Sequence, residues 1–257
     1  MFVIGIAGQA QMGKDTLADR LAIKLNETVQ AFSESQQTPY TDDMGWQRTA
    51  FAKNVKRVFS ETFGVDYDFI EEWKVKSDPP PSFGKNVRQS LQFIGDGFRS
   101  IQDTIWVDLC FRNPLLAQII SDVRYPNEFL RVHKEGGLNI IVGRTEKLND
   151  DSNSSESLIR PYVEWFLNHT EGDVVKVQDL DLKDAPKDSD KFHLFVRNDG
   201  SKSNFYLNID TEVLQFVKDF VFDCTQDLIP NQLLFSLHCA KQENQVLQSE
   251  NTAQLEE

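Results

Sequence analysis

A glycine-bounded segment near the N-terminus has the spacing of a phosphate-binding loop. Gly8, Gly13 and Lys14 stand in the order G-x-x-x-x-G-K. The two glycines let the backbone curl so that consecutive N–H groups converge, and Lys14 can reach the β- and γ-phosphates of a nucleotide. An apolar run over residues 2–7 precedes the loop, and a helical pattern over 14–25 follows it with an N-terminus that attracts anions. The segment therefore predicts a site for the phosphates of a nucleotide rather than an ordinary strand–helix turn.

The two residues after Lys14 narrow the class of nucleotide site. In most such loops a Ser or Thr follows the lysine directly and ligates Mg²⁺, whereas here Asp15 intervenes and the hydroxyl belongs to Thr16. This ending is similar to that of nucleoside monophosphate kinases and argues against a switch GTPase or a motor ATPase. We expect Thr16 and Asp15 to hold Mg²⁺. Asp15 has two other readings: it orients an acceptor phosphate, or it only interacts with the helix dipole.

Length and composition indicate a single α/β domain with a tail. The chain has 257 residues, 40% of them hydrophobic, and a net charge of -13, which disfavours binding to a nucleic-acid polymer. Three dispersed cysteines and four dispersed histidines show no metal-ligand spacing and predict reduced thiols. No segment is long and apolar enough to be a membrane span. We expect a cytoplasmic protein, in the host cytoplasm if it is viral, with no membrane partner.

Hydrophobic periodicity predicts alternating strands and helices. Strands are expected at 2–7, 115–123, 138–142 and 192–196, and helices at 14–25, 51–59, 65–73, 86–98, 103–113, 125–135, 158–167 and 213–221. Strand–helix–strand links of this length imply right-handed crossovers and a parallel sheet. Polar segments at 28–46 and 146–157 are expected to be loops, 77–82 a loop or lid hinge, and 172–191 an exposed insertion. The predicted domain spans 1–224, and 225–257 is a polar C-terminal extension.

Five segments in this order resemble the bacteriophage deoxynucleoside monophosphate kinases, a branch of the P-loop kinase superfamily. The segments are Gly8–Thr16, Phe51-Ala52-x-x-Val55-Lys56, Arg88-x-x-x-Gln92-x-x-Gly95 with Trp106 downstream, Ile120–Glu128 and Val196–Gly200. The resemblance implies a three-layer α/β P-loop kinase fold with a parallel central sheet and helical or lid insertions. It also implies ATP as phosphate donor, a deoxynucleoside monophosphate as acceptor, and Mg²⁺; a homodimer is left open.

The resemblance assigns residues to each side of the reaction. The ATP side comprises Gly8, Met12, Gly13, Lys14, Asp15 and Thr16. We add Arg144, which directly follows a predicted strand, as a lid arginine over ATP; the alternative is a surface residue. The acceptor side comprises Lys56, Arg88, Gln92, Gly95, Asp96, Trp106, Arg124 and Glu128. We assign catalytic roles to Lys14, Asp15, Asp122 and Arg124, because phosphoryl transfer needs cations aimed at the transferred group and a carboxylate to hold water or fix an arginine.

Several of these residues have simpler structural readings. Lys56 and Arg88 fit solvated helix faces, and Trp106 fits the core. Asp122 fits a cap on the helix that follows it, and Arg124 with Glu128 fits a surface i,i+4 pair.

Other functions compete with deoxynucleotide phosphorylation. One is a different small-molecule kinase, acting on a ribonucleotide or resembling dephospho-coenzyme A kinase. The other is a non-catalytic protein that binds a nucleotide and contacts protein partners through its acidic tail. An assay over a panel of acceptors separates these functions.

Overall fold

A six-stranded sheet forms the centre of the protein. The computed structural model describes residues 1–35, 37, 45–112, 115, 117–148 and 154–225. The strand order is β2-β3-β1-β4-β6-β5, and every neighbouring pair is parallel except β5 with β6. The strands are β1 (Phe2–Ala7), β2 (Trp46–Thr49), β3 (Ala117–Val123), β4 (Leu138–Gly143), β5 (Val174–Lys176) and β6 (Leu194–Arg197). The predicted α/β class with a largely parallel central sheet is confirmed.

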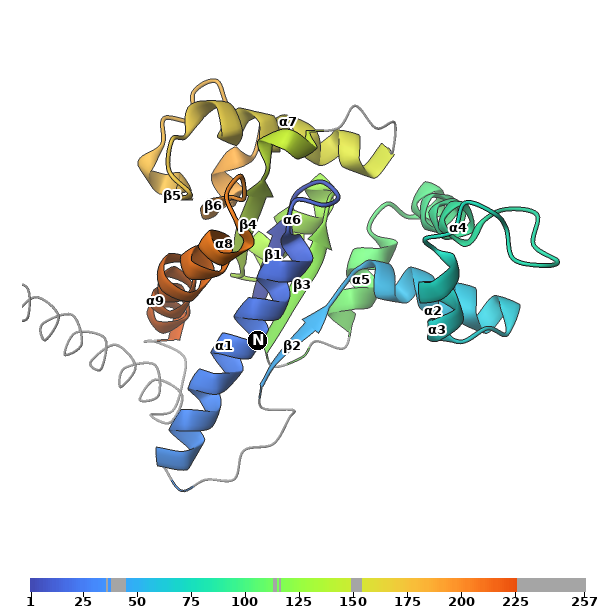
Figure 1. The fold of residues 1–257 in the computed structure, drawn as a ribbon, viewed down its shortest axis with the longest axis horizontal. Coiled ribbons are helices and arrows are strands. Elements are labelled where there is room, and N and C mark those ends of the chain that lie inside the picture. The colour runs from blue at the N-terminus through green and yellow to red at the C-terminus, as the bar shows by residue number, and fades with distance from the viewer. Residues whose placement is uncertain (36, 38–44, 113–114, 116, 149–153, 226–257) are drawn as a thin grey trace, which may run out of the picture.

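Helices surround this sheet (Figure 1). They are α1 (Lys14–Ser35), α2 (Ala52–Phe63), α3 (Tyr67–Trp73), α4 (Val87–Ile101), α5 (Ile105–Arg112), α6 (Pro126–Lys134), α7 (Ser154–His169), α8 (Lys202–Asn208) and α9 (Leu214–Thr225). A π turn, Ile209–Val213, joins α8 to α9, and single 3₁₀ turns occupy Thr145–Lys147, Val177–Asp179 and Ser189–Lys191. No helix in the described ranges is both long and apolar enough to span a bilayer.

The central strands are buried on both faces, as parallel strands require. Helix α1 packs with the π turn and α9, and Arg20 of α1 pairs with Asp210 of that turn. Helices α6 and α7 pack together elsewhere on the sheet, where Phe129 contacts Tyr162 with ring centroids 5.4 Å apart. Phe166 of α7 stacks on Phe195 of β6 at 5.5 Å. The two helical layers thus bury the strands whose carboxyl ends carry the predicted site.

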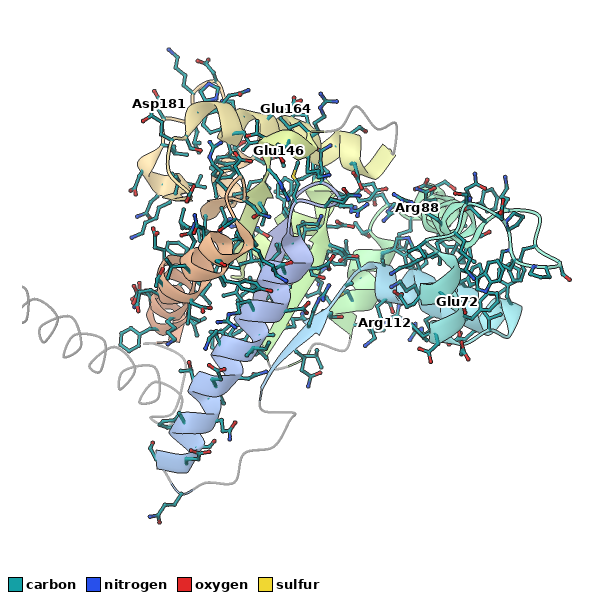
Figure 2. The ribbon with its side chains drawn as sticks, viewed as in Figure 1. Glu72, Arg88, Arg112, Glu146, Glu164 and Asp181 are labelled. Carbon is teal, nitrogen blue, oxygen red and sulfur yellow. The ribbon has the colours of Figure 1, made fainter. Side chains whose placement is uncertain are left out.

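Helices α2 to α5 form a separate group beside β2 and β3. Their own small core contains Phe59, Ile70 and Val87, all fully buried. Figure 2 places Glu72 and Arg88 in this group, and Glu146 and Glu164 on the other side of the loop that follows β1. The loop therefore lies between the α2–α5 group and α7, with a helical element on each side.

Several predicted boundaries are wrong, each for a local reason. Helix α1 extends to Ser35 rather than Leu25, because its polar second half has few helix breakers. Strand β2 begins at the last residue of the predicted loop 28–46 and continues through residues for which no element was predicted, since it is a four-residue edge strand with little alternation. Helix α4 continues past the predicted stop at Gly95–Gly97 and ends at Ile101, and Asn86 caps its start. These errors lie in solvated segments, where hydrophobic periodicity is weak.

The segment 172–191 is less exposed than predicted. Its strand β5 pairs antiparallel with β6, and Val177 beyond it is buried with 2% of its surface exposed. Helix α7 begins at Ser154, four residues before the predicted start. The assignment of 225–257 as a polar extension concerns residues that, after Thr225, lie outside the described part of the chain.

The two-sided core predicts unequal effects of two phenylalanine substitutions. Phe195→Ala removes a fully buried ring that stacks on Phe166, so we expect about 3–5 kcal/mol less free energy of unfolding. Phe93→Ala alters a ring that is 72% exposed on α4, and we expect a change within about 0.5 kcal/mol. Urea unfolding measures both. Equal losses would contradict the described packing.

Candidate nucleotide-binding site

The segment from Gly8 to Lys14 forms a tight loop between β1 and α1. Gly8 has φ +143° and Gly13 has φ +100°, and both lie in the region that favours glycine. A Cβ on Gly8 would lie 2.5 Å from the Val142 carbonyl oxygen, and one on Gly13 would lie 2.5 Å from Asn198 Nδ2. The Asn198 amide donates to the Met12 carbonyl at 2.9 Å. The loop conformation thus requires both glycines and is held from the end of β6.

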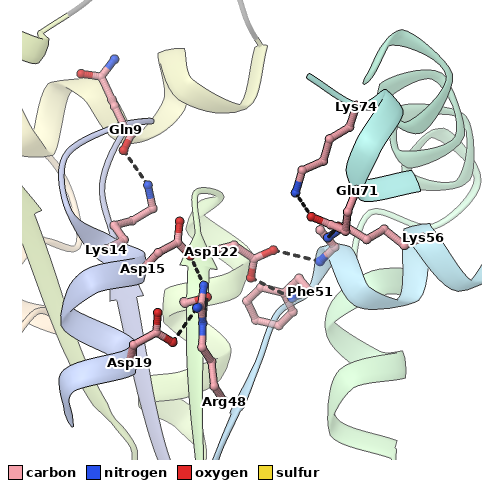
Figure 3. A network of polar contacts seen from close by, with 12 residues as sticks. Gln9, Lys14, Asp15, Asp19, Arg48, Phe51, Lys56, Glu71, Lys74 and Asp122 are labelled. Carbon is pink, nitrogen blue, oxygen red and sulfur yellow. Dashed lines mark hydrogen bonds and ion pairs between the residues drawn. The ribbon is translucent and has the colours of Figure 1, made fainter. Parts of the chain in front are cut away.

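Lys14 is a buried cation at the start of α1. Only 6% of its surface is exposed, and its ammonium donates to the Gln9 carbonyl at 2.5 Å, across the loop (Figure 3). Burial, followed by the Arg124 charge, lowers the pKa of Lys14 to about 8, although Asp15, Glu156 and Asp122 oppose that shift. The ammonium of Lys14 is therefore held inside the loop, in surroundings that disfavour its positive charge.

An arginine that the sequence analysis did not single out holds Asp15. Arg48 of β2 pairs with Asp15 and, at 2.6 Å, with Asp19, and its Nε donates to the Ser121 hydroxyl at 3.2 Å (Figure 3). These contacts join α1 to β2 and β3. Strand β2 is short and polar, so no sequence motif marks Arg48. The one available signal for a functional role is that Arg48 lies near the carboxyl end of a strand, but this strand was not predicted.

The oxygen groups around the loop fit Mg²⁺ held mainly by a nucleotide. Among the described residues no three His, Cys, Asp or Glu side chains cluster into a ready-made metal site. Mg²⁺ commonly takes one or two protein oxygens and completes its shell with phosphates and water. Thr16, half-buried in the first turn of α1, and the exposed Asp15 carboxylate supply oxygens of the right chemistry. Arg48 already engages Asp15, which favours an indirect role through water.

Asp122 caps a different helix from the one considered in the sequence analysis. Its two carboxylate oxygens accept the backbone N–H groups of Phe51 at 2.8 Å and Ala52 at 2.9 Å, at the start of α2. Figure 3 shows the carboxylate between the phosphate loop and α2. The simpler reading, a cap on the following helix α6, is wrong, because Glu128 makes that cap. Asp122 thereby fixes α2 against the end of β3.

Glu128 is buried beneath Arg124 and does not form a surface pair with it. Its carboxylate accepts the backbone N–H groups of Arg124 at 2.7 Å and Tyr125 at 3.0 Å. Only 3% of Glu128 is exposed, and burial, followed by the Asp122 charge, raises its pKa to about 8. The Arg99 guanidinium lies 3.9 Å from it and also covers the Tyr125 ring. Glu128 therefore shapes the turn that carries Arg124.

The Arg124 side chain points to another carboxylate. Its Nη1 lies 3.1 Å from Oε1 of Glu156, in the first turns of α7. The other oxygen of Glu156 accepts the backbone N–H of Ala10 in the phosphate loop at 3.2 Å. The sequence analysis missed Glu156, because the segment before Leu158 was expected to be a loop. Lys14, Asp15, Asp122 and Arg124 do come together, since the charges of the other three residues all act on the pKa of Lys14.

The predicted acceptor residues lie mainly on the α2–α5 group. Lys56 of α2 pairs with Glu71 of α3 at 2.7 Å, and Arg88, Gln92 and Asp96 lie on the exposed surface of α4. Their acceptor role stays a prediction.

Two other predicted acceptor residues are internal. Trp106 is 1% exposed, and its indole N–H donates to the Gly95 carbonyl at 3.0 Å. Its ring packs against Phe98 at 5.5 Å between centroids. Trp106 therefore follows its simpler reading as a core residue that locks α5 to α4 at Gly95, and it offers no open face for a base.

The ends of β4 and β6 meet on the other side of the loop. Arg144 follows β4, and its guanidinium lies 3.3 Å from Glu146. Asp199 accepts the backbone N–H of Thr145 at 2.6 Å and pairs with Arg197 at 3.2 Å. These contacts join the two strand ends beside the Asn198–Met12 bond. Arg144 thus stands at the correct edge of the sheet for its predicted lid role, which stays a prediction.

Sequence comparison points to the same class as the loop. No family model matches the chain. It is 27% identical over 179 residues to a protein of Acanthamoeba polyphaga mimivirus named "Putative deoxynucleotide monophosphate kinase", covering 62% of this chain and 83% of that protein. A dephospho-CoA kinase structure from Campylobacter jejuni matches 85% of this chain and 99% of its own, with TM-score 0.33 and 12% identity. The sequence relative and the phosphate loop together support a P-loop kinase.

The lowered pKa of Lys14 predicts proton uptake when ATP binds. In the free protein Lys14 loses its proton as the pH rises through about 8, whereas a bound triphosphate favours the charged form and raises its pKa. We therefore expect MgATP binding to take up protons at pH 8.5 and much less at pH 7. Calorimetry in two buffers of different ionisation enthalpy measures the uptake. Buffer-independent heats at pH 8.5 would contradict a neutralised Lys14.

Proposed function

We propose that this protein transfers the γ-phosphate of ATP to a deoxynucleoside 5′-monophosphate, producing ADP and a deoxynucleoside diphosphate. The observation that carries the proposal is the loop itself: a buried Lys14 between two glycines, with Arg124 close enough to shift its pKa. A buried lysine beside a second, partly exposed cation is costly, and a bound phosphate would offset both positive charges. The similarity to the mimiviral protein supports a deoxynucleotide as the acceptor.

The proposed reaction is a direct displacement at phosphorus. An oxygen of the acceptor phosphate attacks the γ-phosphorus of ATP, and the bond from that phosphorus to the β-bridging oxygen breaks, so that ADP leaves with the electron pair. The loop N–H groups and Lys14 bind the donor phosphates, and Arg124 binds the transferred group or the acceptor phosphate. Mg²⁺ on Thr16 and the nucleotide would neutralise the β- and γ-phosphate oxygens.

The remaining residues position the two substrates. Asp122 fixes the start of α2, and with it Lys56, relative to β3, so the acceptor side moves with the strand that carries Arg124. Lys56 and Arg88 supply positive charge to the acceptor phosphate in this proposal, and Arg144 covers ATP from the β4 end. Such cations matter because two nucleotides bring several negative charges to one place.

A panel of acceptors tests the reaction class. Coupled detection of ADP should show that at least one deoxynucleoside monophosphate stimulates turnover. Lys14→Ala should reduce the rate at least about 1000-fold, because it removes the buried ammonium that would bind the ATP phosphates. Lys134→Ala, at an exposed lysine of α6, is the matched control and should retain the wild-type rate. Stimulation by ribonucleotides or dephospho-coenzyme A alone would assign another acceptor, and ATP binding without any stimulation would indicate a non-catalytic protein.

The role of Arg124 is tested by separating the two substrates. We expect Arg124→Ala to lower kcat/KM for the acceptor roughly 100-fold, as for the loss of one charge-stabilising donor, with a smaller effect on the Kd of MgATP. Arg112→Ala, at an exposed arginine that ends α5, is the control for lost charge. A larger effect on ATP binding than on acceptor kinetics would move Arg124 to the donor side.

A further inference from the structure

One carboxylate of α7 is buried between the two halves of the proposed site. Glu156 has 2% of its surface exposed, although it lies in the first turns of a helix whose neighbouring residues Leu158 and Arg160 are more open. A buried carboxylate without partners is costly, so its surroundings show what holds it there. Its two oxygens face a backbone N–H and a guanidinium, which are groups that also bind phosphate.

The two oxygens of Glu156 have different partners. Oε2 accepts the Ala10 backbone N–H at 3.2 Å, at the tip of the phosphate loop. Oε1 lies 3.1 Å from Nη1 of Arg124, at the end of β3. In the described part of the chain Oε1 accepts no well-aligned hydrogen bond, so this second contact is an ion pair. One side chain thus links the donor loop to the arginine assigned to the acceptor.

We propose that Glu156 is a positioning residue, which sets the orientation of Arg124 and braces the tip of the phosphate loop for phosphoryl transfer. The inference rests on the proposed function. A guanidinium has five N–H donors in a rigid plane, so a carboxylate at Nη1 of Arg124 fixes the orientation of that plane and the place of its charge. Holding a long side chain in its working geometry removes an entropy cost from the reaction step.

The chemistry of the two contacts allows them to be separated by substitution. In Glu156→Gln the amide oxygen still accepts the Ala10 N–H, but the negative charge facing Arg124 is gone. In Glu156→Ala both contacts are gone. Glu164 supplies a matched control on the same helix, because it is half-exposed and pairs with Arg160, one turn away, at 2.6 Å. Glu164→Gln therefore removes a carboxylate from α7 without touching the loop or Arg124.

The experiment is a double-mutant cycle on full-length protein, with acceptor kinetics and MgATP calorimetry. Glu156→Gln should lower kcat/KM for the acceptor about tenfold or more and leave the Kd of MgATP within about twofold. In an Arg124→Ala background the same change should have an effect of less than about twofold, since Glu156 acts through Arg124. Glu156→Ala should in addition weaken MgATP binding, and Glu164→Gln should resemble wild type.

Each other outcome overturns the proposal. Additive effects of the Glu156 and Arg124 variants would show that Glu156 does not act through Arg124. Tighter MgATP binding by Glu156→Gln would show that the carboxylate competes with phosphate instead of positioning its ligands. Should the Gln variant not fold, Glu156→Asp, which keeps the charge on a shorter stem, is cycled against Arg124→Ala in the same way, with additivity again decisive. A wild type that no acceptor stimulates overturns the proposed function as well, whereas an active wild type with an additive cycle overturns this inference alone.

Discussion

The burial of a positive charge at the start of α1 is the constraint on which the rest of this site depends. Lys14 is almost fully buried, and its ammonium donates to the Gln9 carbonyl within its own loop. Burial favours the neutral amine, so the protein keeps this cation only with the help of nearby carboxylates and, in our proposal, of a bound phosphate. The tight loop, the positive φ of its glycines and the support from Asn198 all serve to place that one group.

The other cations near the site are already paired with carboxylates in the free protein. Arg48 contacts Asp15 and Asp19, Lys56 contacts Glu71, and Arg124 contacts Glu156. A chain with net charge -13 has more carboxylates than cations, so a carboxylate is available for each of these pairs. An acidic protein can in this way hold several cations close together. Pairing also orders the long side chains before a ligand arrives, so less conformational entropy remains to be lost on binding.

The parts predictable from the sequence are those written in consecutive residues. The apolar run of β1, the glycine spacing and the amphipathic start of α1 specify the phosphate loop, and β3 and β4 stand out as apolar strands joined by a helix. The contacts of Asp122 with Phe51 and of Glu156 with Ala10 join residues 71 and 146 positions apart. No local pattern encodes such pairs. The sequence marks Asp122 as a catalytic candidate, with a cap on the following helix as the simpler alternative, and it gives no signal for its contact with α2 or for Glu156 in a polar segment.

Two carboxylates fix Arg124, one at its backbone and one at its side chain. Its backbone N–H is held by Glu128, a carboxylate buried in α6, and its guanidinium is held by Glu156, a carboxylate buried in α7. The first contact sets where the residue leaves the sheet, and the second sets where its charge lies. Because α7 also touches the loop through Ala10, a shift of α7 alters the donor loop and Arg124 together. In the proposed reaction, the position of α7 would therefore affect how the donor and acceptor phosphates are aligned. In-line transfer requires that alignment.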